Sequence, residues 1–465
     1  MFSIILIVLP KQFLLATSSY YIEIKVNKKG YHQILSNEYA LSNNPPKVSG
    51  IELTNKYYNF TSKDAVLKLE WNNRFNYFSY MFNNLKNITY IKITDLFDGQ
   101  IDLSNMFSNC INLETFIFDT NNKKLHNIGN MENMFYNCYS LKSFSFDKLN
   151  LSFYNINGYY DDGRYYITSY DYYHISMSHM FYNCTNLETI GNQISNNIQF
   201  ISDMSYMFYN CISLKNINLA NFIMDNNQII DSSYMFYNCQ KLATIEFSNS
   251  NYYLSDMKYM FYNCSKLNQI DNLNYFSSNN CINMSYLFYN CQNLNTINLK
   301  TNNFYINDVR KMFYNCERLS SFNFNVNPCS TTSPINMSRM FYNCNSIQSI
   351  TIQSITTNNE YLYIYPNDIS SMFYNCRSLV SLSINKLNAT MIEKMSYAFY
   401  NCTRITNLNI FPIYFPNQEI NDMRGVFQNC ESLVSLNLTL FYTPKVEIMW
   451  DMFNGCSHLI NLYNK

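Results

Sequence analysis

The stretch that decides the fold runs from Met204 to Leu219 and reads Met-Ser-Tyr-Met-Phe-Tyr-Asn-Cys-Ile-Ser-Leu-Lys-Asn-Ile-Asn-Leu. Variants of this stretch recur along the chain, each anchored by a cysteine that we number position 0. The thirteen anchors are Cys110, Cys138, Cys184, Cys211, Cys239, Cys264, Cys291, Cys316, Cys344, Cys376, Cys402, Cys430 and Cys456. Most neighbours are 25 to 28 residues apart, with two longer gaps. A period of this length is typical of a repeat architecture and not of a disulfide framework.

The residues before each cysteine repeat with a helix-like spacing. Position −3 is Phe in all thirteen copies, and positions −4 and −7 are usually Met, as in Met207 and Met204. Together with position 0, these offsets lie on one face of an α-helix, so we predict a short helix that packs inward through them. Position −1 is Asn in twelve copies, and Asn tolerates the left-handed conformation that ends helices. We interpret it as a helix cap; a solvent-facing Asn is the alternative.

The residues after each cysteine change to a strand-like spacing. Position +3 is always Leu or Ile, position +6 is Leu, Ile or Phe, and position +8 is usually apolar, as in Leu219. A separation of two between the last apolar residues indicates a short strand. The register predicts a buried set and an exposed set, namely Phe208, Cys211, Leu214 and Ile217 buried and Asn216 and Asn218 exposed.

One helix and one strand per repeat cannot close a core alone, but stacked copies bury a continuous one. Strands in a sheet lie about 4.8 Å apart, whereas helices are about 10 Å across, so such a stack must curve. The sequence therefore predicts an α/β solenoid, a horseshoe or arc with a parallel β-sheet on its concave side and short helices on its convex side.

The repeated Met-Phe-x-x-Cys-x-x-Leu string, complete at Met204 to Leu219, resembles the BspA-type leucine-rich repeats of microbial and protist surface proteins. The resemblance covers residues 81–465, although bacterial stretches such as Leu-Asp-Leu-Ser are scarce here. It implies a leucine-rich-repeat fold and a cell-surface role in adhesion and interaction.

The ends of the chain depart from the repeat. Residues 1–19 begin with an apolar run followed by small residues, which indicates a cleaved signal peptide. An uncleaved apolar start or a gene-model artefact is the alternative, because no basic residue precedes the run. Residues 20–80 alternate polar and apolar side chains, and we assign them as a β-rich N-terminal cap. The solenoid of about 14 repeats then spans residues 81–465, and no later stretch is apolar enough for a membrane helix.

Charge and motif content argue against two functional classes. Lys+Arg and Asp+Glu both number 32, and charged residues make up 14% of the chain against roughly 25% in typical domains. We therefore expect no nucleic-acid partner, since phosphate recognition needs a surplus of cations. The five histidines are scattered and no phosphate-cradling or nucleophile motif occurs, so we expect no metal, no cofactor and no enzymatic activity.

Two surfaces are candidates for partner binding. Positions +5 and +7 point away from the core and carry uncharged polar side chains suited to a protein or glycan ligand; a merely solvated sheet face is the alternative. A Tyr-rich insertion at 154–173 contains an Asp-Gly dipeptide between paired tyrosines, which favours a projecting β-hairpin. A tolerated surface insertion is its alternative. The candidate binding residues are Tyr159, Tyr160, Arg164, Tyr165, Tyr166, Asn216, Asn218, Thr244, Thr296, Asn298, Ser321 and Asn323.

The cysteines and the glycosylation sequons indicate whether the chain resides inside or outside the cell. We interpret the thirteen repeat cysteines as buried reduced thiols, because parallel side chains seldom meet disulfide geometry. The pairing of Cys281 and Cys329 stays open. Asn59 and Asn388 are the sequons best placed for glycosylation of a secreted chain. We predict a non-enzymatic, secreted or cell-surface recognition and adhesion protein; an intracellular repeat scaffold for protein–protein interaction is the alternative.

Overall fold

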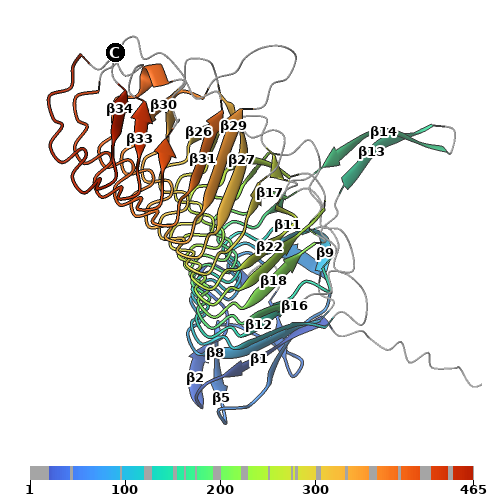
Figure 1. The fold of residues 1–465 in the computed structure, drawn as a ribbon. Helices are drawn as coiled ribbons and strands as arrows, with labels where there is room; N and C mark the ends of the chain where they lie inside the picture. Colours follow the sequence, from blue (N-terminus) through green and yellow to red (C-terminus); the bar gives the residue numbers. More distant parts are fainter. Residues whose placement is uncertain are drawn as a thin grey trace, which may run out of the picture.

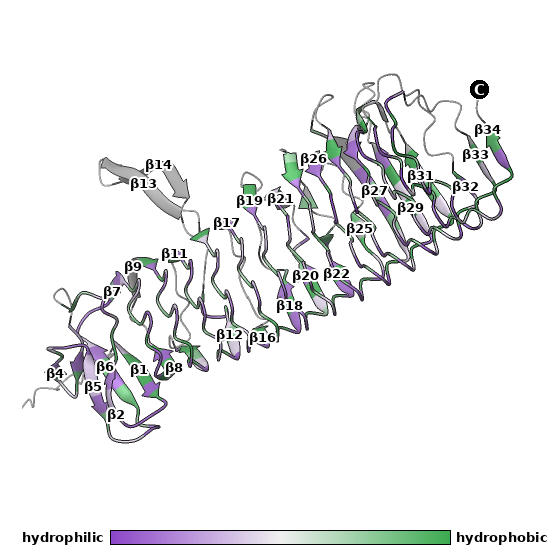
Figure 2. Ribbon diagram, turned by 90° about the vertical axis from the view of Figure 1, so that its left-hand side faces the viewer, coloured by the Kyte–Doolittle hydropathy of each residue, from purple (hydrophilic) through white to green (hydrophobic). Residues whose placement is uncertain are grey.

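A computed structural model gives the fold of the chain (Figure 1). It describes residues 20–41, 45–94, 97–119, 128–149, 154–161, 164–172, 175–191, 201–220, 222, 229–249, 252–273, 276–277, 281–299, 305–329, 334–354, 364–385, 389–408, 420–437 and 444–463. Figure 2 shows the coils stacked one on the next into an elongated solenoid.

Each coil carries one strand before its turn segment, the stretch from position −7 to the cysteine. In the first half of the chain these leading strands form an eight-stranded parallel sheet in the order β23-β21-β19-β17-β15-β11-β9-β7. Their bounds are β7 (Phe75–Tyr77), β9 (Phe97–Asp102), β11 (Ile128–Asn130), β15 (Ile175–Ser176), β17 (Ile201–Asp203), β19 (Ile229–Asp231), β21 (Tyr252–Asp256) and β23 (Phe276–Ser277).

A second strand follows the turn segment at the positions that the sequence predicts. These strands form a parallel sheet in the order β12-β16-β18-β20-β22, with bounds β12 (Ser143–Ser145), β16 (Thr189–Gly191), β18 (Asn216–Leu219), β20 (Thr244–Phe247) and β22 (Gln269–Asp271). Equivalent residues of neighbouring coils face each other, as Asn216 faces Thr244. The predicted parallel sheet is thus confirmed.

The second half of the chain forms two further sheets, one of eight strands and one of three. β27 pairs with β29 along most of its length, with β25 at Asn323 and Phe324, and with β26 at its end. The bounds here are β24 (Cys281–Asn283), β25 (Asn298–Leu299), β26 (Tyr305–Asp308), β27 (Ser321–Pro328), β28 (Ile335–Asn336), β29 (Ser349–Ser354), β30 (Pro366–Asp368), β31 (Ser381–Asn385), the 3-10 helix η3 (Ala389–Met391), β32 (Asn407–Leu408), β33 (Ser435–Asn437) and β34 (Asn461–Tyr463).

The predicted short helices are wrong: across the described residues the turn segments contain no α-helix. The backbone N–H groups of Met204, Tyr206, Phe208 and Asn210 donate to carbonyls of the next coil, so they cannot close helical turns. The N–H groups of Met207, Tyr209 and Cys211 close tight turns, as Cys211 does onto the Phe208 carbonyl at 3.1 Å. Tyr206 and Asn210 adopt φ of 57° and 60°, the left-handed region that a turn tolerates and a helix does not.

The loss of the helices also removes the reason for a horseshoe. The predicted arc required thick helices on one side and thin strands on the other. Here strands and turns stack at the same coil spacing, which suits the elongated form of Figure 2. The Asn at position −1 is left-handed as predicted, but it ends a turn and not a helix. The one copy without Asn there has Gly455, whose φ is 79°.

The core consists of columns of identical side chains. Phe208 is fully buried and stacks on Phe181 and Phe236 with ring centroids 5.3 and 5.4 Å apart. Cys211 is buried beside it and donates its Sγ–H to the Phe181 carbonyl, 3.1 Å away. Leu214 and Ile217 are buried as predicted. A third column links the Asn side chains, in which Asn210 donates to Asn183 at 2.8 Å.

The N-terminal strands are antiparallel. β1 (Tyr20–Val26) pairs with β6 (Leu67–Trp71) on one side and with β8 (Ile88–Ile93) on the other. β8 then pairs in parallel with β10 (Thr115–Phe118), so this sheet runs on into the solenoid. The remaining strands of the region are β2 (Gly30–Gln33), β3 (Lys47–Val48), β4 (Ile51–Glu52) and β5 (Tyr57–Phe60).

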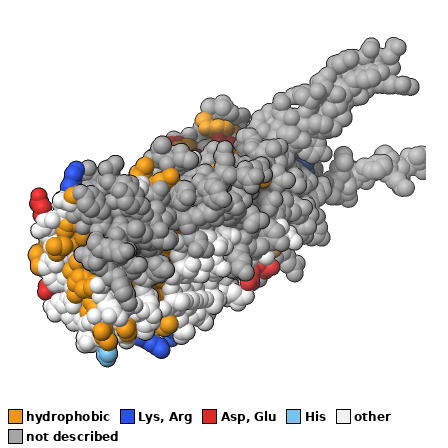
Figure 3. All heavy atoms as spheres, turned by 45° about the horizontal axis from the view of Figure 1, so that its top comes forward, with side chains coloured by type: hydrophobic (Ala, Val, Ile, Leu, Met, Phe, Trp, Pro, Cys, Tyr) orange, Lys and Arg blue, Asp and Glu red, His pale blue; other side chains and the backbone are white. Residues whose placement is uncertain are grey.

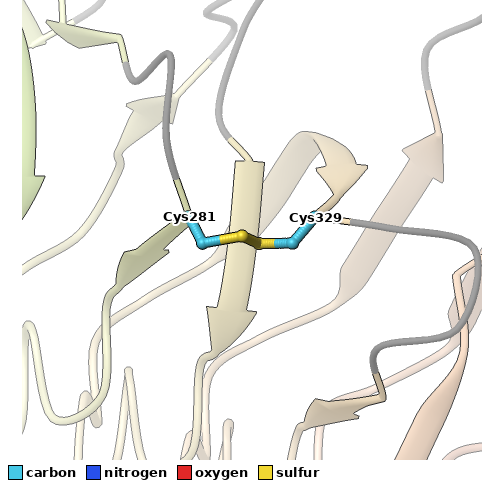
Figure 4. Close-up of a disulfide and its surroundings, with 2 residues drawn as sticks. All are labelled: Cys281 and Cys329. Atoms are coloured by element: carbon cyan, nitrogen blue, oxygen red, sulfur yellow. A yellow bond between two sulfur atoms is a disulfide. The ribbon is translucent and has the colours of Figure 1, made fainter.

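Two local features lie outside the coil pattern. β13 (Tyr154–Asp161) and β14 (Arg164–Tyr172) pair antiparallel as a separate two-stranded sheet, which confirms the predicted hairpin (Figure 1). Cys281 at the start of β24 and Cys329 just after β27 form a disulfide, with their Cα atoms 5.5 Å apart (Figure 4). This pairing resolves a question that the sequence left open.

Candidate functional site

The predicted polar row on the second sheet is present and partly bonded to itself. Asn216 is exposed and accepts from the Thr244 hydroxyl of the next coil at 2.8 Å. Asn218 is half-buried and donates to the Glu246 carboxylate. Thr296, Ser321 and Asn323 are exposed, whereas the side chain of Asn298 lies outside the described residues. These cross-coil bonds reduce the hydrogen-bonding capacity that is left for a ligand.

The hairpin is described by its backbone alone. Its register pairs Tyr159 with Tyr166 and Tyr160 with Tyr165, while Arg164 faces Asp161 at the turn end. The side chains of all five predicted contact residues lie outside the described residues. The register brings those residues to one end of the two-stranded sheet.

The turn segments carry a surface that the sequence analysis missed, here called the tyrosine edge. It consists of two columns of half-buried rings. The position −2 column is Tyr136, Tyr182, Tyr209, Tyr237, Tyr262, Tyr289, Tyr314, Tyr342, Tyr374 and Tyr400, and the position −5 column is His179, Tyr206, Tyr234, Tyr259 and Tyr286. Successive rings stack with centroids 4.3 to 4.7 Å apart. The signal was present in the repeated Tyr-Met-Phe-Tyr string, once its two tyrosines were followed from copy to copy.

The backbone under the position −5 column has an unfavourable conformation for tyrosine. Tyr206, Tyr234, Tyr259 and Tyr286 have φ between 57° and 59°, and the Asn, Lys, Arg and Gly residues at the same position elsewhere have φ of 54° to 55°. Asn or Gly would adopt this conformation at lower cost. Four consecutive coils nevertheless use Tyr there, and ring stacking offsets part of that cost.

Stacking also changes the chemistry of the phenols. Burial raises the pKa of Tyr182, Tyr237 and Tyr289 to about 12, with smaller contributions from neighbouring tyrosines. Tyr286 differs: burial pushes its pKa upward, but Lys311 donates to its hydroxyl at 3.0 Å and leaves the pKa below its usual value. Tyr182, Tyr237 and Tyr289 are therefore neutral at physiological pH and present hydroxyl groups as donors and acceptors.

The described surface contains little that suggests catalysis. In the face drawn in Figure 3 the charged side chains of the described residues are few and scattered. Among the residues that the structure describes, no group of three or more His, Cys, Asp and Glu side chains is arranged to hold a metal ion. His179 is part of the tyrosine edge, because its ring stacks on Tyr206 with the two ring centroids 4.6 Å apart. The repeat cysteines are free thiols, twelve of them buried, and desolvation raises their pKa values, to about 12 for Cys110.

The remaining predicted positions concern modification and membranes. Asn59 is exposed in β5, whereas Asn388 lies outside the described residues. Asn183 and Asn401 are also sequons, but each uses its Nδ2 as a donor in the half-buried Asn column. In the described part of the chain no helix has the length and apolar character needed to span a bilayer.

Two family models match the chain. The BspA type leucine rich repeat region matches residues 54–161 and 173–284 in six copies, and a Mycoplasma protein of unknown function, DUF285, matches residues 251–356 and 367–464. No curated protein matches.

Two of the solved structures to which the chain is similar are described as leucine-rich proteins. One from Bacteroides ovatus is 18% identical over 90% of this chain and 85% of its own, with a TM-score of 0.40. A leucine rich cell surface protein from Faecalibacterium prausnitzii is 15% identical over 82% of each chain, with a TM-score of 0.30. The repeat motif and the matching family model agree: residues 54–161 and 173–284 of the chain are BspA-type leucine-rich repeats.

Proposed function

We propose that this chain is a non-enzymatic recognition protein, secreted or displayed at the cell surface, that binds protein or glycan partners through its solenoid surface. Leucine-rich-repeat solenoids of this family suggest protein interaction at a surface. The proposal goes further in assigning the location and in naming the tyrosine edge as the primary contact surface.

The tyrosine edge is the observation that carries the proposal. Tyrosine gives a large contact area, a hydroxyl for hydrogen bonding and little side-chain entropy to lose, and it is enriched at interfaces for these reasons. The rings are half-buried and stacked, so they are held in place before a partner arrives. Tyr is also retained where Asn or Gly would fit the backbone better. Folding alone does not account for that choice.

The test compares two sets of variants on the purified chain. One set carries Tyr209→Ser, Tyr237→Ser and Tyr262→Ser in the position −2 column; the control carries Asn216→Ala and Ser321→Ala on the polar row. Binding is measured on immobilised extracellular-matrix proteins and a glycan array. We expect the tyrosine variants to weaken binding at least tenfold and the control to change it less than twofold. The proposal would be contradicted if both sets of variants lost binding equally. It would also be contradicted if the unchanged chain bound none of the matrix proteins and none of the glycans.

The disulfide favours secretion. Disulfides persist in oxidising compartments, and Cys281 and Cys329 are the described cysteines that lie outside the repeat column of free thiols. The thirteen free thiols favour the alternative, an intracellular scaffold in a reducing compartment. Sequencing the mature N-terminus from the native source separates the two. A start near Ser18 to Tyr21 supports secretion, and an intact Met1 on a cytosolic protein contradicts it.

Three further roles belong to the same proposal. Residues 20–80 act as a cap, because β1 and β6 cover the sheet edge at the first coil with antiparallel strands. Asn59, exposed on β5, carries a glycan in the secreted protein. The hairpin β13–β14 acts as a secondary contact beside the tyrosine edge, and the polar row contributes less than a twofold share of the binding.

A further inference from the structure

A hollow on the solenoid surface collects positive charge without any carboxylate in its lining. Its volume is about 570 Å³, and it is lined by Lys241, Ala243, Lys266, Asn268, Asn293 and Arg318. The three cations occupy position +2 of their coils, and their side chains are exposed. None of the three forms a salt bridge among the described residues. We call this set the basic hollow.

The adjacent row at position +4 explains why the hollow exists. In the preceding coils this row alternates between Glu and Lys, and the opposite charges form ion pairs. Lys142 contacts Glu114 and Lys215 contacts Glu188, both at 2.6 Å. The row continues at Ala243 and Asn268, which are too short and uncharged to extend the pattern. The paired charges therefore end where the unpaired cations begin.

The backbone of this row does not change at that point. Lys215 N–H donates to the Glu188 carbonyl, and Ala243 N–H donates to the Lys215 carbonyl in the same way. The small side chain of Ala243 accordingly leaves open a space that a longer residue fills in the earlier coils. The pKa of Glu188 is lowered mainly by its hydrogen bond from Lys215. The charge of Lys241 lowers it further by a smaller amount, so Lys241 lies close enough to this row to affect it.

We propose that the basic hollow binds a carboxylated or sulfated oligosaccharide that lies along the solenoid axis. Lys241, Lys266 and Arg318 span four successive coils, about 14 Å at the spacing of paired strands. Such a line of cations matches acidic groups at intervals along one chain, and Arg can bind an oxyanion through two parallel hydrogen bonds. Asn268 and Asn293 lie among the cations and supply amide groups for sugar hydroxyls.

Other polyanions fit less well. A protein that contacts about six to ten phosphates of duplex DNA needs roughly two to three times as many cations as the three found here. Anionic membranes are recognised by clusters of about four to eight Lys and Arg on an accessible face, whereas these cations line a recess. A volume of about 570 Å³ lies within the range of small-ligand sites.

The inference rests on the proposed recognition role but uses residues outside the tyrosine edge, so each can fail without the other. The probe is a heparin-derived sulfated hexasaccharide, measured by calorimetry on the purified chain. Its desulfated counterpart, a single-stranded oligonucleotide of equal charge and phosphatidylserine vesicles are compared with it. The variants are Lys241→Gln/Lys266→Gln/Arg318→Gln and Ala243→Glu, with Lys142→Gln/Lys215→Gln as the matched control.

We expect the sulfated hexasaccharide to bind and its desulfated form to bind at least tenfold more weakly. The triple variant and Ala243→Glu should each weaken binding at least tenfold, and the control less than twofold, with unchanged thermal unfolding midpoints. Ala243→Glu keeps all three cations and adds a carboxylate at position +4, where two earlier coils also have Glu. It therefore tests whether the hollow binds the ligand while Lys241, Lys266 and Arg318 remain present. The proposal is overturned if no binding occurs, if the control loses as much, or if the oligonucleotide or vesicles bind equally well.

Discussion

The turn segment and the strand that follows it differ in how strictly their residues are specified. At position −3 every one of the thirteen copies has Phe, and at position −1 twelve have Asn. At positions +5 and +7, by contrast, Asn, Thr, Ser and Glu replace one another, as Asn216 and Asn218 become Thr244 and Glu246 one coil later. The turn segment is restricted by column stacking and left-handed backbone, whereas the outward strand face only has to remain polar.

The strongest test of this difference places the same charge in both regions. Phe208→Asp puts a carboxylate into the fully buried Phe column, where an unpaired charge costs several kcal/mol or more. Asn216→Asp puts it on the exposed face, where about 0.5 kcal/mol or less is expected. Denaturant unfolding followed by circular dichroism measures both. We expect Phe208→Asp to unfold the adjoining coils; similar stabilities for the two variants would refute the assigned register.

Alkaline pH should act on the turn segment through its thiols. Burial raises the pKa of Cys110 to about 12 and shifts the pKa of Cys211 upward too, from an ordinary value of 9.0. Below pH 9 both folded and unfolded thiols are protonated, so these groups add no pH dependence. Above pH 9 the unfolded chain releases protons that the folded chain keeps, and stability falls by about 1.4 kcal/mol per pH unit for each buried thiol.

The measurement for this prediction is the free energy of unfolding at pH 8.0, 9.5 and 10.5. Cys211→Ala serves as the control: it should lower stability most at pH 8.0, and its difference from the unchanged chain should shrink above pH 9 by one thiol's share. A stability that is constant up to pH 10.5 would mean that the thiols are not desolvated.

A smaller effect is expected at the Asn column. Asn210 has a φ of 60° and donates to Asn183. Asn210→Ala loses the ladder hydrogen bond and strains the left-handed backbone, for a cost of about 1 to 3 kcal/mol. Asn210→Gly loses the same hydrogen bond but fits the backbone, so it should be the more stable of the two. Thermal unfolding of both variants checks this order, and the reverse order would argue against the left-handed assignment.

The sequence predicted the burial pattern more accurately than the local conformation. Offsets of −7, −4, −3 and 0 fit one face of a helix, yet the turn segment buries Met204, Met207, Phe208 and Cys211 without any helix. Two different backbones share this spacing, and only hydrogen bonds to the next coil distinguish them. Such bonds depend on neighbouring repeats and are not visible within a single copy.

The same limit explains what was missed on the surface. Tyr206 and Tyr209 look like ordinary exposed residues in one repeat, and they become columns only when the coils are stacked. The Cys281–Cys329 pair was equally inaccessible, because 48 residues separate the two cysteines in sequence. The hairpin was predictable because its paired tyrosines and Asp-Gly turn are local signals.

The smallest effect on stability is expected from removing that hairpin. Residues 154–173 match no position of the repeat, and the coils on either side already pair directly with each other. β11 pairs with β15 through Asn130 and Ser176, and β12 pairs with β16 through Ser143 and Thr189. The solenoid is therefore continuous across the insertion. Deleting 154–173 and joining Phe153 to His174 should shift the thermal unfolding midpoint by less than about 2 °C.

The deletion also separates contact from folding. If the hairpin contributes to recognition, the deleted chain should bind its matrix or glycan partner more weakly while its unfolding transition stays cooperative and unshifted, because the residues that bind would not be those that fold. Deleting 154–173 from the Tyr209→Ser, Tyr237→Ser and Tyr262→Ser variant shows whether the two surfaces act on one partner, since independent contacts give additive losses of binding free energy. A broad or lowered transition in the deleted chain would instead mean that the hairpin packs against the coils and belongs to the solenoid's core.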